Sequence, residues 1–387
     1  MFGLHSSTPH KPENIFPGCH QFLLIGLIVG LLVGCAPTTP TMILPTLMAT
    51  AVFPTPTEPL QAISLPGTYT PAPAAIATPA LTGTPWSTAV PTITPTPGPS
   101  PTPDPYAGLT IAELALRPYG GGELRIVETM AELPNFTRSL ITYPSDGLTI
   151  YGFMNMPPGD KLPVVLVLHG YVDPADYQIQ AYTTPYADAF ANAGYLVIHP
   201  NYRNYPPSDS GPNLFRVGYA IDTLNLIALI KTQAGQPGPL AQADPEAIYL
   251  FGHSMGGGVA LRVISISSDV RAAALYGAMS GDEQKNFARI WEWSGGEDGR
   301  IELDTGDDLL RAISPSYHLE RIRVPVSLHH GLDDGVVPPI WSDQLCEALR
   351  GLDKPVECLH YAGQPHNFDS AGQRRLLVNV RDFFARH

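Results

Sequence analysis

The sequence of 387 residues is poor in basic side chains. It has 22 lysines and arginines against 35 aspartates and glutamates, which gives a formal net charge of −13. A protein that binds nucleic acid through the phosphates needs a basic face. The charge balance therefore argues against a nucleic-acid partner, although it says little about a small substrate.

Cysteine is also scarce, and the sequence has no C-x-x-C pair and no Cys/His cluster with the spacing of a zinc site. His329 and His330 are adjacent, so in a strand they point to opposite faces and cannot share a metal ion there. We expect no metal and no cofactor. The four cysteines are Cys19, Cys35, Cys346 and Cys358.

The apolar run near the N-terminus is too short to span a membrane. It covers residues 22–33, whereas a transmembrane helix needs about 20 residues and a signal-peptide core about 7–15. The run ends in Leu32-Val33-Gly34-Cys35, which resembles the lipobox of bacterial lipoproteins. This resemblance implies that residues 1–35 are a signal peptide and that Cys35 is the lipidated first residue of the mature protein. A hydrophobic leader of another kind is the alternative, because Lys11 is the only basic side chain before the run.

Residues 36–105 are of low complexity. Eighteen of these 70 residues are proline, and the only charges are Glu58 and Asp104. Proline fixes φ and removes a hydrogen-bond donor, so neither helix nor sheet can propagate. We predict an extended, disordered linker that could reach on the order of 200 Å; a tail without a role is the alternative. Residues 106–387 then form one α/β domain with a sizeable core.

Short apolar runs in the folded region alternate with helical patterns. Residues 136–143 and 148–156 are strand-like and are joined by Pro144-Ser145-Asp146-Gly147, a hairpin signal. Residues 163–170 form a continuous apolar run, as in strands buried inside a parallel sheet. From there, strands and helices alternate to the end of the chain. This order predicts an open, mostly parallel α/β sheet whose site lies at the carboxyl ends of its strands.

The segment Gly252-His253-Ser254-Met255-Gly256 is a G-x-S-x-G motif between a strand-like run and a helical pattern. That context is typical of a nucleophile elbow, in which a strained turn exposes the serine hydroxyl. The positions two before and two after the serine crowd each other, and glycine fits both. Ser254 is therefore the candidate nucleophile. The alternative is a glycine-rich turn with an incidental serine.

A serine nucleophile needs a base and an acid that orients it. Asp333 and Asp334 follow a predicted strand, and His366 lies in the loop after the last strand. The chain order serine, acid, histidine is the order used on this kind of sheet. We predict that His366 is the base, and either aspartate is placed to orient it.

Residues 136–387 resemble an α/β-hydrolase of the prolyl-oligopeptidase-like and dienelactone-hydrolase-like branch. The resemblance implies an α/β-hydrolase fold with a mostly parallel, eight-stranded sheet and helices on both faces. It assigns the acid to Asp334, and the oxyanion hole to the backbone amides of Met255 and Tyr171. For Tyr171, an ordinary loop aromatic is the alternative. The motifs are Ser145-Asp146-Gly147, the 163–170 run, the elbow, His330-Gly331 with Asp334-Gly335-Val336-Val337-Pro338, and Pro365-His366-Asn367-Phe368.

These features predict an extracytoplasmic serine hydrolase, held at the membrane by its lipid anchor, that cleaves ester or peptide/amide bonds. Its substrate would be a small molecule or a peptide. A carboxylesterase or dienelactone-hydrolase-like enzyme is one alternative to a peptidase, because the chain has no room for the β-propeller of full-length oligopeptidases. A non-catalytic surface binding protein on the same fold is another. We expect His169 to brace its loop and His253 to pack inside the elbow.

Residues 281–308 interrupt the alternation of strands and helices. The segment is acidic and contains Phe287, Trp291 and Trp293. It is either a small cap whose aromatic side chains line the pocket, or a solvated loop whose tryptophans are plugged into the core.

Cys346 and Cys358 lie in a predicted helix and in the strand that follows it. Two cysteines twelve positions apart in an exported domain favour a disulfide. The alternative is a pair of reduced, buried cysteines that pack as small hydrophobic residues.

Overall fold

The computed structural model describes residues 104–387. The predicted signal peptide of residues 1–35, with Cys35, and the predicted linker as far as residue 103 lie outside the described residues.

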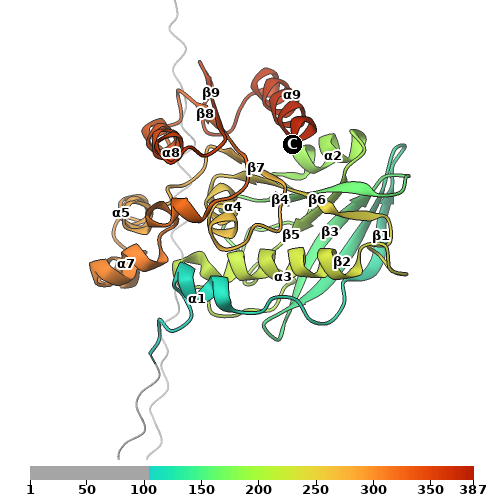
Figure 1. The fold of residues 1–387 in the computed structure, drawn as a ribbon, viewed down its shortest axis with the longest axis horizontal. Helices are drawn as coiled ribbons and strands as arrows, with labels where there is room; N and C mark the ends of the chain where they lie inside the picture. The colour runs from blue at the N-terminus through green and yellow to red at the C-terminus, as the bar shows by residue number, and fades with distance from the viewer. Residues whose placement is uncertain (1–103) are drawn as a thin grey trace, which may run out of the picture. The chain divides into compact units, whose positions relative to one another are not determined.

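One twisted sheet organises the described chain (Figure 1). It has nine strands in the order β1-β2-β3-β5-β4-β6-β7-β8-β9, rather than the eight predicted. The first three strands pair antiparallel, β3 pairs antiparallel with β5, and all later pairs are parallel. The strands are β1 (Arg125–Glu132), β2 (Thr137–Ser145), β3 (Leu148–Met156), β4 (Leu162–Leu168), β5 (Leu196–Pro200), β6 (Ala243–His253), β7 (Ala272–Tyr276), β8 (Val326–Gly331) and β9 (Val356–Tyr361).

Helices cover both faces of the sheet, as predicted. In Figure 1, α2 and α9 lie on one side of it, and α1 and α3 lie on the other. None of the described helices combines the length and apolarity needed to span a bilayer. The α-helices are α1 (Ile111–Leu116), α2 (Thr184–Asn192), α3 (Val217–Gln233), α4 (Met255–Ile266), α5 (Glu283–Trp293), α6 (Arg300–Leu303), α7 (Asp307–Ile313), α8 (Pro339–Gly351) and α9 (Ser370–Arg386), and short 3-10 turns span Leu214–Arg216, Pro315–Tyr317 and Leu319–Arg321.

Strand β4 shows how one apolar run serves two cores. Val164 and Leu166 pack in the core that contains residues of α1, α3 and α4. Val165 and Val167 pack in the core that contains residues of α2 and α9. Successive side chains of a strand point to opposite faces, so a strand covered on both faces must be apolar throughout.

Local signals explain several element boundaries. The β2–β3 hairpin turns on Asp146 and Gly147, whose φ values are 51° and 81°; two positive φ values are what the Asp-Gly signal predicts. Helix α1 begins with a capping box between Thr110 and Glu113. Helix α2 begins at Thr184, its N-cap is Thr183, and no side chain caps it.

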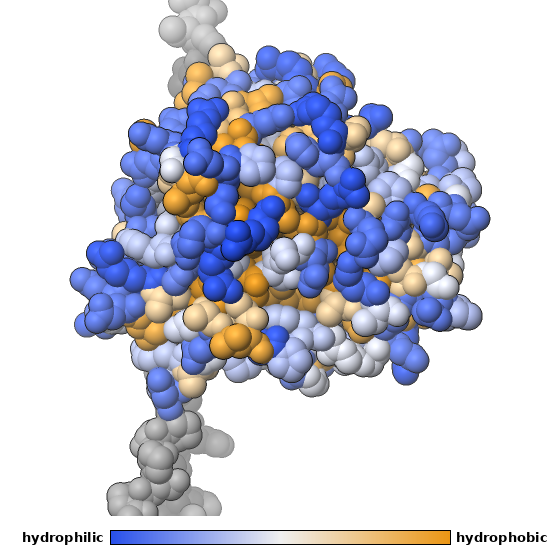
Figure 2. Space-filling view, viewed as in Figure 1, coloured by the Kyte–Doolittle hydropathy of each residue, from blue (hydrophilic) through white to orange (hydrophobic). Residues whose placement is uncertain are grey.

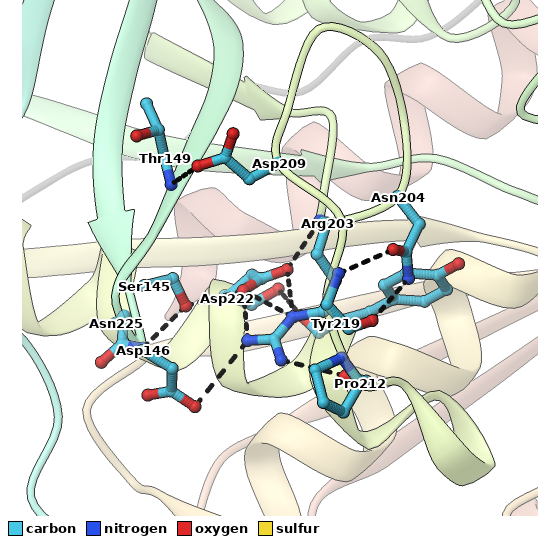
Figure 3. A network of polar contacts seen from close by, with 12 residues as sticks. Ser145, Asp146, Thr149, Arg203, Asn204, Asp209, Pro212, Tyr219, Asp222 and Asn225 are labelled. Carbon is cyan, nitrogen blue, oxygen red and sulfur yellow. Dashed lines mark hydrogen bonds and ion pairs between the residues drawn. The ribbon is translucent and has the colours of Figure 1, made fainter. Parts of the chain in front are cut away.

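A buried ion pair holds the loop between β5 and α3 (Figure 3). The Arg203 side chain is 4% exposed and the Asp222 side chain is fully buried, with Nη2 2.8 Å from Oδ1. The Arg203 backbone amide also donates to Asp222 at 2.8 Å, and Arg203 Nη1 donates to the Pro212 carbonyl at 3.0 Å. Ser145 donates to the same carboxylate at 2.6 Å. The network ties the β2–β3 hairpin, the loop and α3 together.

The face of the molecule shown in Figure 2 is mainly hydrophilic. Apolar residues show mostly in its middle, between hydrophilic ones. The acidic composition of the chain agrees with such a surface.

Candidate active site

The turn between β6 and α4 forces an unusual backbone on Ser254, with φ 55° and ψ −117°. A side chain at Gly252 would collide with the backbone of Gly256, and one at Gly256 would collide with the carbonyl of Leu168. Only glycine leaves room for this turn, so the two glycines of the motif have the role that the sequence predicts.

Backbone hydrogen bonds fix Ser254 at the edge of the sheet. Its amide donates to the Tyr276 carbonyl at 2.9 Å, and its carbonyl accepts from Met279 at 3.1 Å. Helix α4 starts at the next residue, so its positive N-terminal end lies beside the serine. The residue is 8% exposed. This environment favours an oxygen that becomes negative during a reaction.

The structure places Asp334, not Asp333, against His366. His366 Nδ1 lies 2.7 Å from Asp334 Oδ2. Because an ionised carboxylate only accepts hydrogen bonds, Nδ1 carries the proton and Nε2 keeps its lone pair. Asp333 lies exposed in the same turn.

Four donors hold the Asp334 carboxylate. Besides His366, the backbone amides of Val336 and Val337 donate to Oδ1 at 2.9 and 2.8 Å, and His330 Nε2 lies 3.1 Å from Oδ2. Burial alone would raise the pKa of Asp334, but the hydrogen bonds from His330, His366 and the backbone hold it well below its usual range. The group is therefore a carboxylate at neutral pH.

The turn after β7 links Ser254 to the His366–Asp334 pair. Gly277 follows Tyr276, whose carbonyl accepts from Ser254. A Cβ atom at Gly277 would lie 3.3 Å from His366 Nδ1 and 3.5 Å from Asp334 Oδ2. The three predicted residues thus meet at the carboxyl ends of β6, β8 and β9. Among the described residues, no hydrogen bond joins the Ser254 hydroxyl to His366, and such bonds often tighten only when substrate binds.

The two predicted oxyanion donors lie on neighbouring strand ends. Met255 is the first residue of α4, and Tyr171 follows β4, which pairs with β6. Within residues 104–387, neither backbone amide has an intramolecular acceptor. Tyr171 is 66% exposed, so its ring is not part of the core.

The acidic segment 281–308 forms α5 and α6 beside the loop that carries Asp334. Arg289 of α5 donates to the carbonyls of Gly335 at 3.1 Å and Val336 at 3.4 Å. Phe287 is buried, but Trp291 and Trp293 are 37% and 46% exposed. The tryptophans are therefore not plugged into the core, and that interpretation of the segment is wrong.

A disulfide joins Cys346 of α8 to Cys358 of β9, with the Cα atoms 6.4 Å apart. The helix and the strand lie side by side, as the short turn between them predicts. Within the described residues, no three potential metal ligands cluster together.

Sequence reasoning missed several polar side chains of the site. His330 contacts Asp334, and both Tyr276 and His253 contact the backbone carbonyl of His366. Tyr182 contacts His253. His330 could have been found from its position four residues before Asp334. The roles of Tyr182 and Tyr276 have no local signal, because their partners lie far away in the sequence. His169 braces its loop as expected: its ring nitrogens lie 2.7 Å from the Gly170 carbonyl and 2.9 Å from the Asn201 carbonyl.

Two family models match the chain. Residues 163–298 match the model described as alpha/beta hydrolase fold, and residues 239–387 match the prolyl oligopeptidase family. Together they cover the elbow, Asp334 and His366. These matches support the predicted superfamily.

This chain is also similar to known proteins and to solved structures. The chain is 24% identical over 233 residues to lysophosphatidylserine lipase ABHD12 of Danio rerio, covering 53% of this chain and 56% of that protein. It is similar to a puromycin-hydrolyzing peptidase of Mycobacterium tuberculosis, with 24% identity, a TM-score of 0.51 and coverage of 66% of this chain and 40% of the other. An acetyl xylan esterase from Paenibacillus sp. R4 gives 17% identity, a TM-score of 0.51 and coverage of 70% and 92%. This likeness confirms the predicted α/β-hydrolase fold, while the chain spans about half or less of the first two proteins.

Proposed function

We propose that this chain, an α/β-hydrolase by fold, is a serine hydrolase in which Ser254 is the nucleophile, His366 the general base and Asp334 the orienting acid. The observation that carries the proposal is the His366–Asp334 hydrogen bond beside a serine held in a strained turn. The presence of the serine, the histidine and the aspartate together also favours an enzyme over a binding protein that merely keeps the fold.

The proposed chemistry follows from the proton on His366 Nδ1. Nε2 takes the Ser254 proton while the serine oxygen attacks the substrate carbonyl, and the amides of Met255 and Tyr171 donate to the resulting oxyanion. His366 then gives its proton to the leaving group, which leaves an acyl-enzyme, and water repeats the cycle to release the acid. Loss of one oxyanion donor typically costs about 100- to 1000-fold in rate.

The substrate is an ester or a peptide/amide, taken as a small molecule or a peptide. The match to the prolyl oligopeptidase family supports peptide bonds, and the likeness to an acetyl xylan esterase and to a lipase supports esters. The loops around the site expose the apolar side chains of Tyr171, Leu332 and Val336, which suits an uncharged group next to the scissile bond. A panel of acyl esters and aminoacyl amides with matched side chains would separate the two classes.

We place the enzyme outside the cytoplasm, anchored by lipid on Cys35. The apolar run of residues 22–33 supports this location, and so does the disulfide, because disulfides persist in oxidising compartments. Labelling with radioactive palmitate tests the anchor. Incorporation should be lost in Cys35→Ala and kept in Cys19→Ala, whereas loss in neither variant would contradict the anchor.

A fluorophosphonate probe tests the nucleophile. The wild-type chain should be labelled, while Ser254→Ala should lose labelling and at least about 10⁴-fold in turnover, with a melting curve that is nearly unchanged. Ser265→Ala is the matched control, because Ser265 is a buried serine of the same helix α4. Labelling that survives in Ser254→Ala would move the nucleophile elsewhere, and a folded wild type without labelling would favour the binding-protein alternative.

A further inference from the structure

A second histidine lies buried between the candidate nucleophile and the candidate base. His253 precedes Ser254 and is fully buried. Its ring stacks on Tyr276 with centroids 4.1 Å apart, and its centroid is 4.7 Å from that of His366. The proposed reaction as derived above gives this imidazole no role.

The hydrogen bonds of His253 define one tautomer. Nε2 lies 3.2 Å from the His366 backbone carbonyl, which can only accept, so Nε2 carries the proton. Burial, together with the neighbouring His366, lowers the pKa of His253 to about 3, so the ring is neutral. Nδ1 is then an acceptor, and the Tyr182 hydroxyl beside it donates. Burial raises the pKa of Tyr182 above its usual range, so this hydroxyl keeps its proton.

The His366 carbonyl has a second donor. The Tyr276 hydroxyl donates to it at 2.8 Å and accepts from the Phe368 amide at 2.8 Å. His253 ends β6 and Tyr276 ends β7, so two adjacent strand ends hold one carbonyl of the loop after β9. The backbone of His366 is thus fixed to the sheet while its side chain is fixed to Asp334.

We propose that His253 is a positioning residue for the hydrolase reaction: its Nε2–H anchors the His366 backbone, and the Tyr182 hydroxyl sets the tautomer that makes this possible. The inference depends on the proposed function, in which His366 is the base. The proposed role also explains why the His253 ring must be uncharged. His366 becomes an imidazolium during each half-reaction, and a second positive ring at this distance would oppose that step. The other titratable groups that face the pair are Tyr182, Tyr276, His330 and Asp334.

Substitutions that separate packing from hydrogen bonding test the role. His253→Phe keeps a stacking ring but loses both hydrogen bonds, and we expect kcat to fall about 10- to 100-fold with KM within about threefold, because small displacements of a catalytic group are costly. His253→Gln places an amide N–H near the Nε2 position and should recover most of kcat. Tyr182→Phe keeps the Nε2–H of His253 but removes the donor to its Nδ1, so kcat should fall by about three- to tenfold.

His318→Phe is the matched control. His318 Nε2 also faces a backbone carbonyl at 3.2 Å, that of Arg311, on a segment that carries no candidate catalytic residue. Its loss should leave kcat and KM unchanged. Equal kcat values in wild type and His253→Phe would overturn the proposal, and so would a glutamine variant no more active than the phenylalanine variant.

A measurement that needs no turnover separates this inference from the proposed function. In ¹⁵N-histidine NMR spectra, the signal that vanishes in His253→Phe should be that of a neutral ring protonated at Nε2 from pH 5 to 8, and it should shift in Tyr182→Phe. A His253 ring protonated at Nδ1 would overturn the proposal even if fluorophosphonate labels Ser254. Conversely, if the NMR spectrum is as expected but fluorophosphonate does not label Ser254, only the hydrolase assignment is refuted. If His253→Phe does not fold, the glutamine and Tyr182→Phe variants carry both tests.

Discussion

Two buried polar clusters of this protein look alike but differ in what they leave unpaired. Around Arg203 and Asp222, the guanidinium and both carboxylate oxygens meet protein partners (Figure 3). Around Asp334 the carboxylate is equally well satisfied. Within the described residues, however, His366 Nε2 and the amides of Met255 and Tyr171 have no partner. The Arg203–Asp222 cluster is saturated by protein partners, whereas the site around Asp334 leaves two donors and one acceptor unpaired, as the proposed function requires.

The largest effect that we expect in either cluster is the loss of kcat on substitution of Asp334. Asp334→Asn replaces the carboxylate that holds Nδ1–H and can favour the wrong imidazole tautomer, so kcat should fall by about 10⁴-fold. Because the pKa of Asp334 is held well below its usual range, the wild-type group stays ionised from pH 5 upward and should contribute no acid limb to the activity profile there. Steady-state rates between pH 5 and 9 check both points.

Asp333→Asn is the control for that substitution, with the same chemistry one residue earlier and on the exposed side of the turn. It should retain activity within about threefold, as surface changes away from a site usually do. If Asp333→Asn is the inactive variant, the acid has been assigned to the wrong residue.

A substitution in the Arg203–Asp222 cluster should change the stability of the protein but not its catalytic rate. Asp222→Asn leaves the buried Arg203 guanidinium with only the more distant, partly exposed Asp146 carboxylate, 3.8 Å away, and should cost about 3–5 kcal/mol of unfolding free energy. Urea unfolding measures this loss, and kcat of the folded fraction should match the wild type. Replacing both partners, Arg203→Met with Asp222→Leu, should recover much of the loss, because no charge is then stranded.

Asp209→Asn removes the same charge from an exposed site in the loop that precedes α3, where Asp209 accepts from the Thr149 amide at 2.7 Å. Its cost should stay within about 1 kcal/mol. Equal losses from Asp209→Asn and Asp222→Asn would mean that burial of the ion pair contributes nothing special.

The comparison also shows which features a sequence can predict. The Asp146-Gly147 turn and the glycines of the elbow are local, since neighbouring residues dictate the backbone they need. The pairing of Asp334 with His366, 32 positions apart, was predicted because both lie in motifs at strand ends. The family resemblance implied eight strands, whereas the sheet has nine, and its edge strand β1 has register shifts and mostly exposed residues.

Contacts to a backbone atom, and contacts between segments that carry no motif, could not be predicted. His253 meets the carbonyl of His366 across 113 positions, and Arg203 meets Asp222 across 19. A backbone carbonyl leaves no trace in the residue type, and a buried arginine looks like any other until its loop is placed. For the same reason, packing was the natural interpretation of His253, and the structure adds the hydrogen bonds to it.

The last prediction concerns the covalent link between α8 and β9, and its expected effect is smaller than those of the substitutions at Asp334 and Asp222. Cys346 and Cys358 close a loop of 12 positions, and by the chain-entropy argument such a bond stabilises by roughly 3 kcal/mol. Reduction should lower the urea midpoint of the wild type by an amount equivalent to that value, yet leave the midpoint of the Cys346→Ala/Cys358→Ala double variant unmoved. Turnover of the folded protein should not change, because the bond joins α8 to β9 and neither cysteine is one of the groups that hold Asp334. A wild-type midpoint that ignores the reductant, or free thiols at both positions in protein taken from the native envelope, would refute the bridge and weaken the case for an oxidising location.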